Sequence, residues 1–544
     1  MAAKEYLPLQ VLVLSVLTAA LFLPTLWSGF VYDARLQILT DPFIHTAANW
    51  WNVLSFRVLG MDVLDFNRPV HLAFLMFDSA VWGTNPIGYH LTSILLHAAN
   101  TALLFLFIRA LLFAGMPGRP GFPVIAVPFL CALFFGIHPI MTEAVCEPTY
   151  REDLLVAFFS LSALLLAVGH RDERRGPDLV RACLCAAACF LAVASKENGI
   201  AAPLLLLSFW ILFRRKDRPA FWWRAVGLGF LLVAAFIGLR FSLEPEHSVI
   251  FEGKPDYPGG TVFSAMALMP QVLVLYLKNL VWPTALCADY GFLSVRHLPP
   301  LFCIILLAVL AALSAFACYR SRVLSFALLA VILPLLPVAN LIPIYRVAAD
   351  RYLYFPMVGI SLALACLLGS TFLTKNRGAA IVAILALVSL LGLYARIHID
   401  RQKVWSGSLA LWQDTFQKSP NSVTAASGLG EAFWELGSLE ASEIALRETC
   451  RLSGWEKADS IADLAAVLHQ RGKEEEAARA LDLALRLDPR LSDPDSRVRA
   501  LALTAREADA IKQVLLLHPP GGAGAAPDLH PDLSTDQLPA SPGQ

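Results

Sequence analysis

The run LPLQVLVLSVLTAALFLPTLW, at positions 7–27, contains no charged side chain. A helix of about 20 apolar residues crosses a hydrocarbon core of about 30 Å. Further runs of this kind follow along the chain. The segments predicted to cross a membrane are 7–28, 88–113, 121–137, 152–169, 179–195, 199–213, 223–241, 301–319, 323–339, 353–373 and 379–396. The sequence therefore predicts an all-α integral membrane protein with about eleven transmembrane helices.

The composition agrees with a membrane protein. Of the 544 residues, 57% are hydrophobic and 16% are charged, whereas soluble domains have about 25% charged residues. The formal net charge is zero, so charge predicts no nucleic-acid partner. The ten cysteines lie mostly in apolar runs and form no CxxC pair, so we interpret them as small packing residues.

The segment 265–281 is ambiguous, because it is apolar enough to cross a membrane or to lie at its surface. The positive-inside rule decides between the two. If 265–281 does not cross, all the basic short loops fall on one side. These loops contain Lys4, Arg119, Arg171, Arg174, Arg175, the stretch 214–218, Arg320, Arg322, Lys375 and Arg377. We therefore predict a cytoplasmic N-terminus, with the segments 29–89, 138–151 and 242–300 and the C-terminal region outside.

The composition changes after position 399, where charges return at helical spacing. Gly472, Ala477 and Leu481 fit the second half of a tetratricopeptide (TPR) repeat, and Gly437 and Leu446 occupy the same offsets 35 residues earlier. Such helix pairs bury their apolar faces only against neighbours. We predict a membrane domain over 1–399, a C-terminal TPR α-solenoid over 400–515 and a disordered tail over 516–544.

Charged and polar groups near the outer boundary of the predicted membrane helices are the candidate site residues, because charges at that depth are usually kept for a function. Arginine and lysine would hold the phosphate of a lipid-linked anion, and a carboxylate such as Asp33 would act as general base on an incoming hydroxyl. The candidates are Asp33, Arg68, His90, His138, Glu143, Arg151, Asp153, Lys196, Glu197, Asp350 and Arg351.

Several of these residues lie in an ordered set of motifs. The set comprises FVYD (30–33), Arg68-Pro69, YHL (89–91) with His97 and Asn100, FGIHPIMTEAV (135–145), REDLL (151–155), SKE (195–197) and DRYLYFP (350–356). Together with C-terminal TPR repeats, this set resembles the transmembrane-and-TPR protein O-mannosyltransferases and their bacterial relatives, within the GT-C class of glycosyltransferases. The resemblance covers about residues 1–490.

The resemblance implies a GT-C fold in a bacterial inner membrane, with the active site at the first outer loop. It implies inverting transfer of a sugar from a polyprenyl-phosphate donor to a protein or glycan acceptor, which the TPR repeats would present. Asp33 would be the base, with Arg151, Lys196 and Arg351 near the phosphate. The family usually has two adjacent acidic residues after the first span, but Ala34 stands at the second position. This departure counts against a divalent cation and leaves metal use and catalytic competence open.

Two other functions stay open at this stage. An enzyme of the O-antigen ligase or polymerase type also has many spans and large outer loops, and would use a pre-built glycan on a diphosphate. A non-catalytic scaffold or transporter would agree with Ala34. A transporter, however, is expected to carry interrupted helices and charges at the membrane midplane, whereas the charges here gather at one boundary.

Overall fold

The computed structural model describes residues 7–113, 122–168, 178–213, 219–244, 257, 260–291, 299–373, 377–493 and 505–517. These residues form helices joined by turns, with no strand among them. Most of the basic loop residues used for the orientation lie outside the described residues, namely Lys4, Arg119, Arg171, Arg174, Arg175, 214–218 and Lys375. The predicted tail from position 518 onward also lies outside them.

Each of the eleven predicted spans forms a helix. They are α2 (Leu7–Phe22) with its continuation η1 (Leu23–Trp27), α5 (Pro86–Phe113), α6 (Phe122–Ile137), α8 (Arg151–Val168), α9 (Asp178–Ser195), α10 (Ala201–Phe213), α11 (Pro219–Leu243), α14 (Pro300–Arg320), α15 (Arg322–Leu335), α16 (Pro356–Leu373) and α17 (Arg377–Val404). Seven helices of the described chain, or eight with a pair bent by 48° at position 138, could cross a membrane by length and composition alone. The protein is a multi-pass membrane protein.

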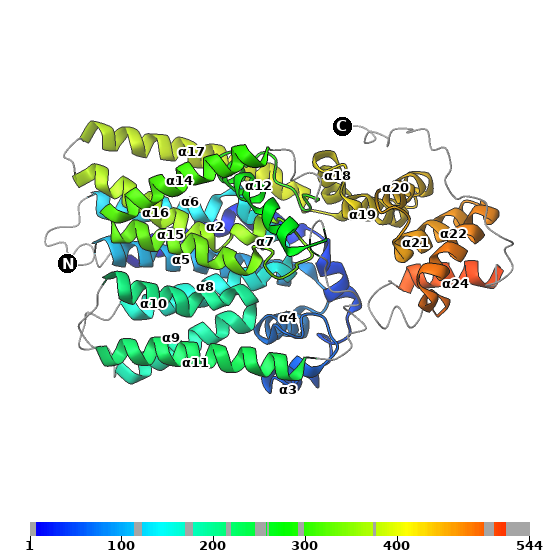
Figure 1. Cartoon of the computed structure of the whole chain (residues 1–544), viewed down its shortest axis with the longest axis horizontal. Coiled ribbons are helices and arrows are strands. Elements are labelled where there is room, and N and C mark those ends of the chain that lie inside the picture. Colours follow the sequence, from blue (N-terminus) through cyan, green and yellow to red (C-terminus); the bar gives the residue numbers. More distant parts are fainter. Residues whose placement is uncertain are drawn as a thin grey trace.

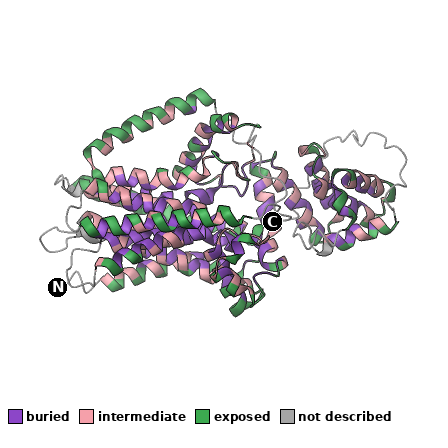
Figure 2. Ribbon diagram, turned by 60° about the horizontal axis from the view of Figure 1, so that its bottom comes forward, coloured by how far each residue is buried: buried purple, intermediate pink, exposed green. Residues whose placement is uncertain are grey.

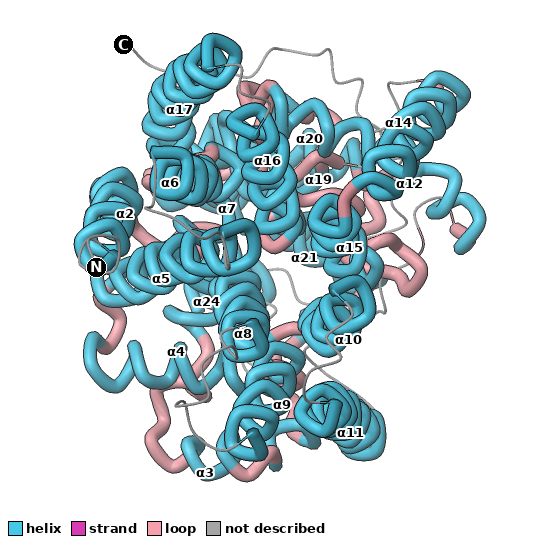
Figure 3. Tube along the Cα trace, turned by 90° about the vertical axis from the view of Figure 1, so that its left-hand side faces the viewer, coloured by secondary structure: helices cyan, strands magenta, loops and turns pink. Residues whose placement is uncertain are grey.

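The helices run side by side in one bundle, with the C-terminal helices beyond one end of it (Figure 1). Seen end-on, α5 and α8 lie inside, while α2, α11, α14 and α17 lie at the periphery (Figure 3). Buried residues lie between the helices and exposed residues along the outer faces (Figure 2). Many exposed side chains on the peripheral helices are large and apolar, for example Leu231, Phe316 and Val382. An apolar outer surface of this kind is suited to lipid.

One end of the bundle collects the segments that the sequence predicts to lie outside, and the segment 29–89 is called the first outer loop for that predicted side. We call this end the repeat end, because α17 leaves the bundle there and continues into the C-terminal helices (Figure 1). The first outer loop folds there into a π-helical turn (Arg35–Thr40), α3 (Asn49–Leu54), η3 (Arg57–Gly60) and α4 (Pro69–Trp82). These elements share a small apolar core that includes Ile38, Val53 and Leu72. The loop is therefore a packed cap on the bundle.

The ambiguous segment forms α12 (Val262–Val281), which is one of the seven helices that pass the length and composition test for a span. Before α12, the Tyr257 hydroxyl donates a hydrogen bond of 3.2 Å to the carbonyl of Leu341, in the segment between α15 and α16 at the repeat end. The chain leaves α12 at the same end, where the Asp289 carboxylate accepts a hydrogen bond of 2.5 Å from Ser422. Both flanks of α12 therefore lie at one end of the bundle, which is the arrangement expected of a helix that does not cross.

The C-terminal helices stack as antiparallel pairs. They are α18 (Ser408–Lys418), α19 (Val423–Glu435), α20 (Leu439–Leu452), α21 (Ala458–Gln470), α22 (Glu474–Leu487) and α24 (Ala505–Leu517). Gly437 and Gly472 end the first helix of each pair with φ of +76° and +74°, a conformation that glycine adopts without a steric cost. The pairs α19–α20 and α21–α22 correspond to the two predicted repeats. The predicted boundary at 399 falls inside α17, which continues to Val404.

Candidate active site

Asp33 lies at the start of the first outer loop, directly after a strained residue. Tyr32 has φ of 51°, a left-handed conformation that is rare for an aromatic residue and costs of order 1–3 kcal/mol. The turn projects Asp33 out of the core, so its side chain is exposed. Its Oδ2 accepts a hydrogen bond of 2.9 Å from the Tyr150 hydroxyl. Strain of this kind persists where surrounding structure enforces it, and it is common at functional sites.

Tyr150 joins Asp33 to the next charged pair. The guanidinium carbon of Arg351 lies 3.9 Å from the centre of the Tyr150 ring, which is within cation–π distance. Glu143 accepts hydrogen bonds from both the Arg351 side chain and its backbone N–H, the latter at 3.0 Å. Tyr150 thus brings three predicted site residues into one network, namely Asp33, Glu143 and Arg351. Tyr150 itself was not among the predicted site residues.

A second carboxyl group lies near Asp33, and sequence reasoning missed it. Glu147 is fully buried, and its Oε1 accepts a hydrogen bond of 2.8 Å from the Thr149 hydroxyl. Burial, and next the negative charge of Asp33, raise the pKa of Glu147 well above its usual value. Glu147 is therefore expected to be neutral beside an exposed carboxylate. The available signal was a lone glutamate inside the apolar stretch that follows the histidine–proline motif.

Ala34 itself lies in the core of the outer loop. It is fully buried, in the same apolar cluster as Ile38 and Phe43. A carboxylate at this position would have to enter that cluster. In this chain the second carboxyl group beside Asp33 comes from the 138–151 connection instead of from the adjacent position.

A second charged cluster lies alongside, centred on Arg68. Its guanidinium contacts Asp65 at 2.8 Å, Glu152 at 2.5 Å and Glu197 at 3.2 Å. The Lys196 ammonium lies 2.8 Å from Glu152 and 2.6 Å from Asp153. The first outer loop, the start of α8 and the α9–α10 turn are therefore held together by alternating charges, and four predicted site residues meet here. The four are Arg68, Asp153, Lys196 and Glu197.

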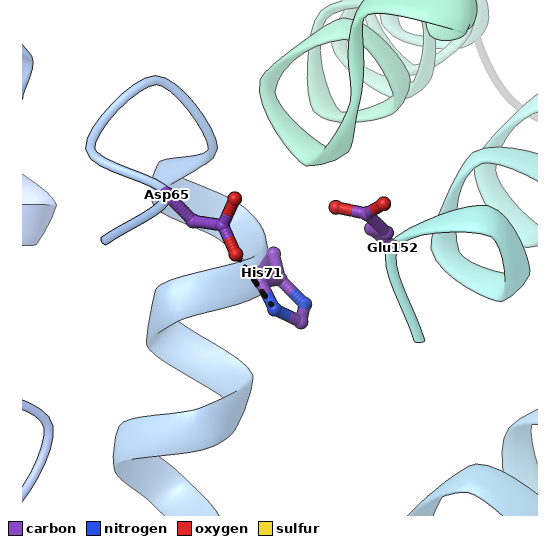
Figure 4. Close-up of side chains that lie close together, drawn as sticks. All are labelled: Asp65, His71 and Glu152. Carbon is purple, nitrogen blue, oxygen red and sulfur yellow. Dashed lines mark ion pairs between the residues drawn. The ribbon is translucent and has the colours of Figure 1, made fainter. Parts of the chain in front are cut away.

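Within this cluster, Asp65, His71 and Glu152 form the described group with a geometry that could hold a metal ion. One ligand atom from each lies within 4.8 Å of the others, and the His71 ring lies between the two carboxylates (Figure 4). Burial lowers the pKa of His71 to about 4, against the opposing charge of Asp65, so the ring is neutral. However, Arg68 and Lys196 already contact both oxygens of Glu152. The positive charge that a metal would supply is provided by side chains, so the donor set fits a cation poorly.

Arg151 is placed differently from the other candidates. It is fully buried, and its guanidinium lies 2.7 Å from the equally buried Asp78. It also donates to the Ser93 hydroxyl and, at 2.8 Å, to the Tyr89 carbonyl. Its donors therefore connect α8 to α4 and α5. Arg151 therefore has a structural role in holding these helices together, and it lies away from solvent.

The predicted histidines also bind neighbouring helices. The His97 ring contacts the Gly136 carbonyl at 3.0 Å and the Tyr354 hydroxyl at 2.8 Å, so its Nε2 is the donor and its Nδ1 the acceptor. His138 contacts the Leu280 carbonyl at 3.1 Å and accepts from the Ile140 N–H. His90 is fully buried beside the Phe30 ring. His97 and His138 therefore fix the packing of the helices that carry the site, and His90 packs beside the first outer loop.

Asp350 directly precedes Arg351 and has a separate set of hydrogen-bond partners. It is buried, and its Oδ1 accepts hydrogen bonds from the Tyr290 hydroxyl at 2.6 Å and from Asn279 at 3.2 Å. Burial, followed by the charge of Glu143, raises the pKa of Asp350 to about 7. Asp350 therefore joins the segment after α12 to the segment before α16.

The C-terminal helices cover the other side of Asp33. The Tyr32 ring packs edge-to-face on Trp412, with ring centres 4.9 Å apart. The guanidinium carbon of Arg346 lies 5.4 Å from the centre of the same Tyr32 ring. It forms an ion pair of 3.2 Å with Asp289 and donates to Thr424 at 2.9 Å. The exposed Asp33 thus lies where the outer loop, the bundle and α18–α19 meet, and Arg346 is a second arginine that interacts electrostatically with it.

The amino-acid sequence that forms this outer loop and bundle is similar to the sequences of known proteins. The chain is 24% identical over 449 residues to the protein O-mannosyl-transferase F38B6.6 of Caenorhabditis elegans, covering 80% of this chain and 61% of the relative. The chain is similar to the protein O-mannosyl-transferases. It is also 30% identical over 323 residues to Tmtc1 of Drosophila melanogaster, with 53% of this chain and 35% of the relative covered. For human TMTC1 the identity is 24% over 454 residues, with shares of 73% and 50%.

The resemblance predicted from the motifs is confirmed, because the relatives carry the name of that enzyme class. The chain spans about one third to three fifths of the length of these O-mannosyl-transferase relatives. No protein-family model and no solved structure matches it.

Proposed function

We propose that this protein is a membrane glycosyltransferase that transfers a mannosyl-type sugar from a polyprenyl-phosphate donor to an acceptor hydroxyl at the repeat end. The observation that carries the proposal is the placement of Asp33. Its carboxylate is exposed, is oriented by Tyr150 and lies beside Arg351 and Arg346. A base and a pair of phosphate-binding cations are the groups that such a transfer requires.

In this mechanism Asp33 takes the proton from the acceptor hydroxyl as the oxygen attacks the anomeric carbon. The bond from that carbon to the donor phosphate breaks on the opposite face, so the configuration inverts. The leaving phosphate gains negative charge, which Arg351 and Arg346 stabilise through charge-assisted hydrogen bonds. We assign Glu143 the task of orienting Arg351, which it contacts at both the side chain and the backbone.

The Arg68 cluster supports the site from the side in this proposal. Lys196 lies 5.7 Å from the Tyr352 ring centre, and Arg351 lies 5.3 Å from the same ring. The Arg68 cluster, which includes Glu152, Asp153 and Glu197, holds Lys196 against the Tyr352 ring. Through this ring it fixes the position of Arg351. We assign Arg151, His90, His97 and His138 to the scaffold, because their donors and rings are engaged within the bundle.

The orientation in the membrane is part of the proposal. With the N-terminus in the cytoplasm of a bacterial cell, the repeat end and the TPR helices face the periplasm. Cysteine substitutions at Ser321 and Ser453, in a background without the native cysteines, test this orientation. An impermeant maleimide added to intact spheroplasts is expected to label position 453 and not 321. The reverse pattern contradicts the orientation.

The decisive experiment compares wild-type protein with Asp33→Asn in lipid nanodiscs, using labelled polyprenyl-phosphate mannose and a peptide with serine and threonine. Removing a general base typically costs about 10²–10⁴-fold in rate, so the variant is expected to lose transfer while binding the donor. Asp62→Asn, in the same loop, is the matched control. Undiminished transfer by Asp33→Asn contradicts the assignment. Transfer only from a glycan on a diphosphate indicates a ligase, and no transfer from any donor indicates a non-catalytic scaffold.

A further inference from the structure

The first helix of each C-terminal pair carries two acidic residues. Glu431 and Glu435 lie one turn apart on α19, and Asp459 and Asp463 lie one turn apart on α21. Residues four apart share a helix face. In Figure 1, α19 and α20 lie next to the bundle, and α21, α22 and α24 lie beyond them. Glu507, on α24, adds a fifth carboxylate near Glu431 and Asp463. We call these five residues the acidic surface.

Two members of the acidic surface lack the partners that acidic residues elsewhere in the repeats have. Elsewhere in the repeats, Glu443 contacts three cations, namely Arg447, Arg471 and Lys473. Glu431 accepts a hydrogen bond of 3.2 Å from the Ser427 hydroxyl, but neither Glu431 nor Asp463 forms an ion pair within the described part of the chain. Asp463 is 5% exposed, and its Oδ1 has no hydrogen-bond partner. A buried carboxylate oxygen without a partner is costly, so it points to a ligand that supplies a donor.

The carboxylates also raise each other's affinity for protons. Burial, followed by the charge of Glu507, raises the pKa of Glu431 to about 7 and that of Asp463 well above its usual value. The cation that approaches them from the membrane domain is Arg35, which pairs with Glu435 and lies near Glu431. A cationic ligand would relieve the remaining repulsion.

The acidic surface begins close to the candidate base. Arg35 follows Asp33 by two residues, so their Cα atoms are at most about 7 Å apart. A polypeptide that lies along α21 and α19 and extends past Arg35 therefore reaches Asp33. A single metal ion is a poorer fit, because the described group whose ligand atoms gather within 4.8 Å is Asp65, His71 and Glu152, and not these carboxylates.

We propose that the acidic surface binds a basic segment of a polypeptide acceptor, with lysine or arginine side chains opposite Asp463 and Glu431. The proposal rests on the proposed function, because it identifies the acceptor class that is presented to Asp33. Stacked helical repeats commonly bind extended partners, and here the charge specifies a cationic one.

The test uses the full chain in nanodiscs and two fluorescent peptides. One carries serine and threonine flanked by four lysine or arginine residues, and in the other these four are glutamine. The variant Glu431→Gln/Asp463→Asn is compared with the control Glu448→Gln/Asp482→Asn, which removes carboxylates from α20 and α22. Wild type and control are expected to bind the basic peptide at least tenfold more tightly than the glutamine peptide, with affinity falling as salt rises. The double variant is expected to lose this preference.

Three outcomes would overturn the acidic-surface proposal. Equal binding of both peptides by wild type overturns the acidic-surface proposal, as does a preference that survives in the double variant. Calcium binding that is lost in the double variant, without a peptide preference, assigns the surface to an ion and also overturns it. Asp33→Asn should bind the basic peptide normally and fail only in transfer, so loss of the proposed function and loss of the peptide site are distinguished. Thermal unfolding of the variants verifies that they are folded.

Discussion

The Tyr150 hydroxyl donates a hydrogen bond of 2.9 Å to the Asp33 carboxylate across 117 residues of sequence. This bond joins the first outer loop to the 138–151 connection, and the Tyr150 ring also carries the Arg351 guanidinium. One side chain therefore orients the candidate base and positions the candidate phosphate ligand. The bond also links the two halves of the mechanism, because base and phosphate ligand must act on opposite faces of one sugar.

The first prediction concerns Tyr150→Phe. The substitution keeps the ring under Arg351 and removes the hydrogen bond to Asp33. Hydrogen bonds to charged groups contribute about 1.5–3 kcal/mol, so we expect kcat to fall about tenfold to a hundredfold with little change in donor KM. Steady-state transfer in nanodiscs measures this split. Tyr352→Phe, which also keeps its ring near Arg351, is expected to stay near wild type, and an equal loss in both variants would argue against a specific role for the Tyr150 hydroxyl.

A second prediction uses Ala34 and Glu147. Ala34→Asp places a carboxylate in an apolar core next to another buried carboxyl group, so we expect it to lower the free energy of unfolding by about 1–3 kcal/mol or more. Glu147→Gln keeps a neutral side chain that can accept from Thr149, so on its own it should retain transfer at neutral pH. The double variant should be less destabilised than Ala34→Asp alone. Additive effects in thermal unfolding would show that the two positions do not interact.

The buried pair of Arg151 and Asp78 gives a third prediction. Removing one partner of a buried ion pair costs about 3–5 kcal/mol, whereas an apolar pair of similar volume is often neutral or stabilising. Arg151→Met should therefore destabilise strongly, and Arg151→Met/Asp78→Leu should recover most of the loss. Arg396→Met, which removes an exposed partner of Asp400, should change stability by less than about 1 kcal/mol. If Arg151→Met is stable but loses donor binding, the phosphate role predicted from the sequence is correct.

A fourth prediction follows from Asp350. Its pKa is raised to about 7 in the folded protein, above the usual value of about 4. Protonation therefore favours the folded state, and this stabilisation is complete below about pH 4 and is lost as pH rises toward 7. Three pKa units correspond to as much as about 4 kcal/mol. Asp350→Asn stays neutral, so it should match wild type at pH 4.5 and exceed it at pH 8. The melting temperature at each pH measures this, with Asp400→Asn as the control, and a constant difference across the range would contradict it.

The sequence predicted the helices well, because a membrane segment satisfies its backbone internally and shows its length as an apolar run. Counting the predicted membrane crossings also placed four charged residues at the same end of the bundle, namely Asp33, Glu143, Lys196 and Arg351. Glu147 and Arg346 were missed for a different reason. Each is an ordinary charged residue in its own segment, and its proximity to Asp33 depends on how the 138–151 connection and the segment before α16 fold back on the outer loop.

The sequence by itself determined the class of the protein, namely a bundle of apolar helices followed by repeats, since hydrophobic length and helical period are local properties. The tertiary structure decided which charges are available for chemistry. Arg151 looked equivalent to Arg351 in the sequence, yet packing places Arg151 among Asp78, Ser93 and Tyr89 inside the bundle. Arg351 instead pairs with Glu143 and contacts Tyr150, the partner of the exposed Asp33. The physical reason is that a buried charge must be paired, and the partner is chosen by the contacts between distant segments.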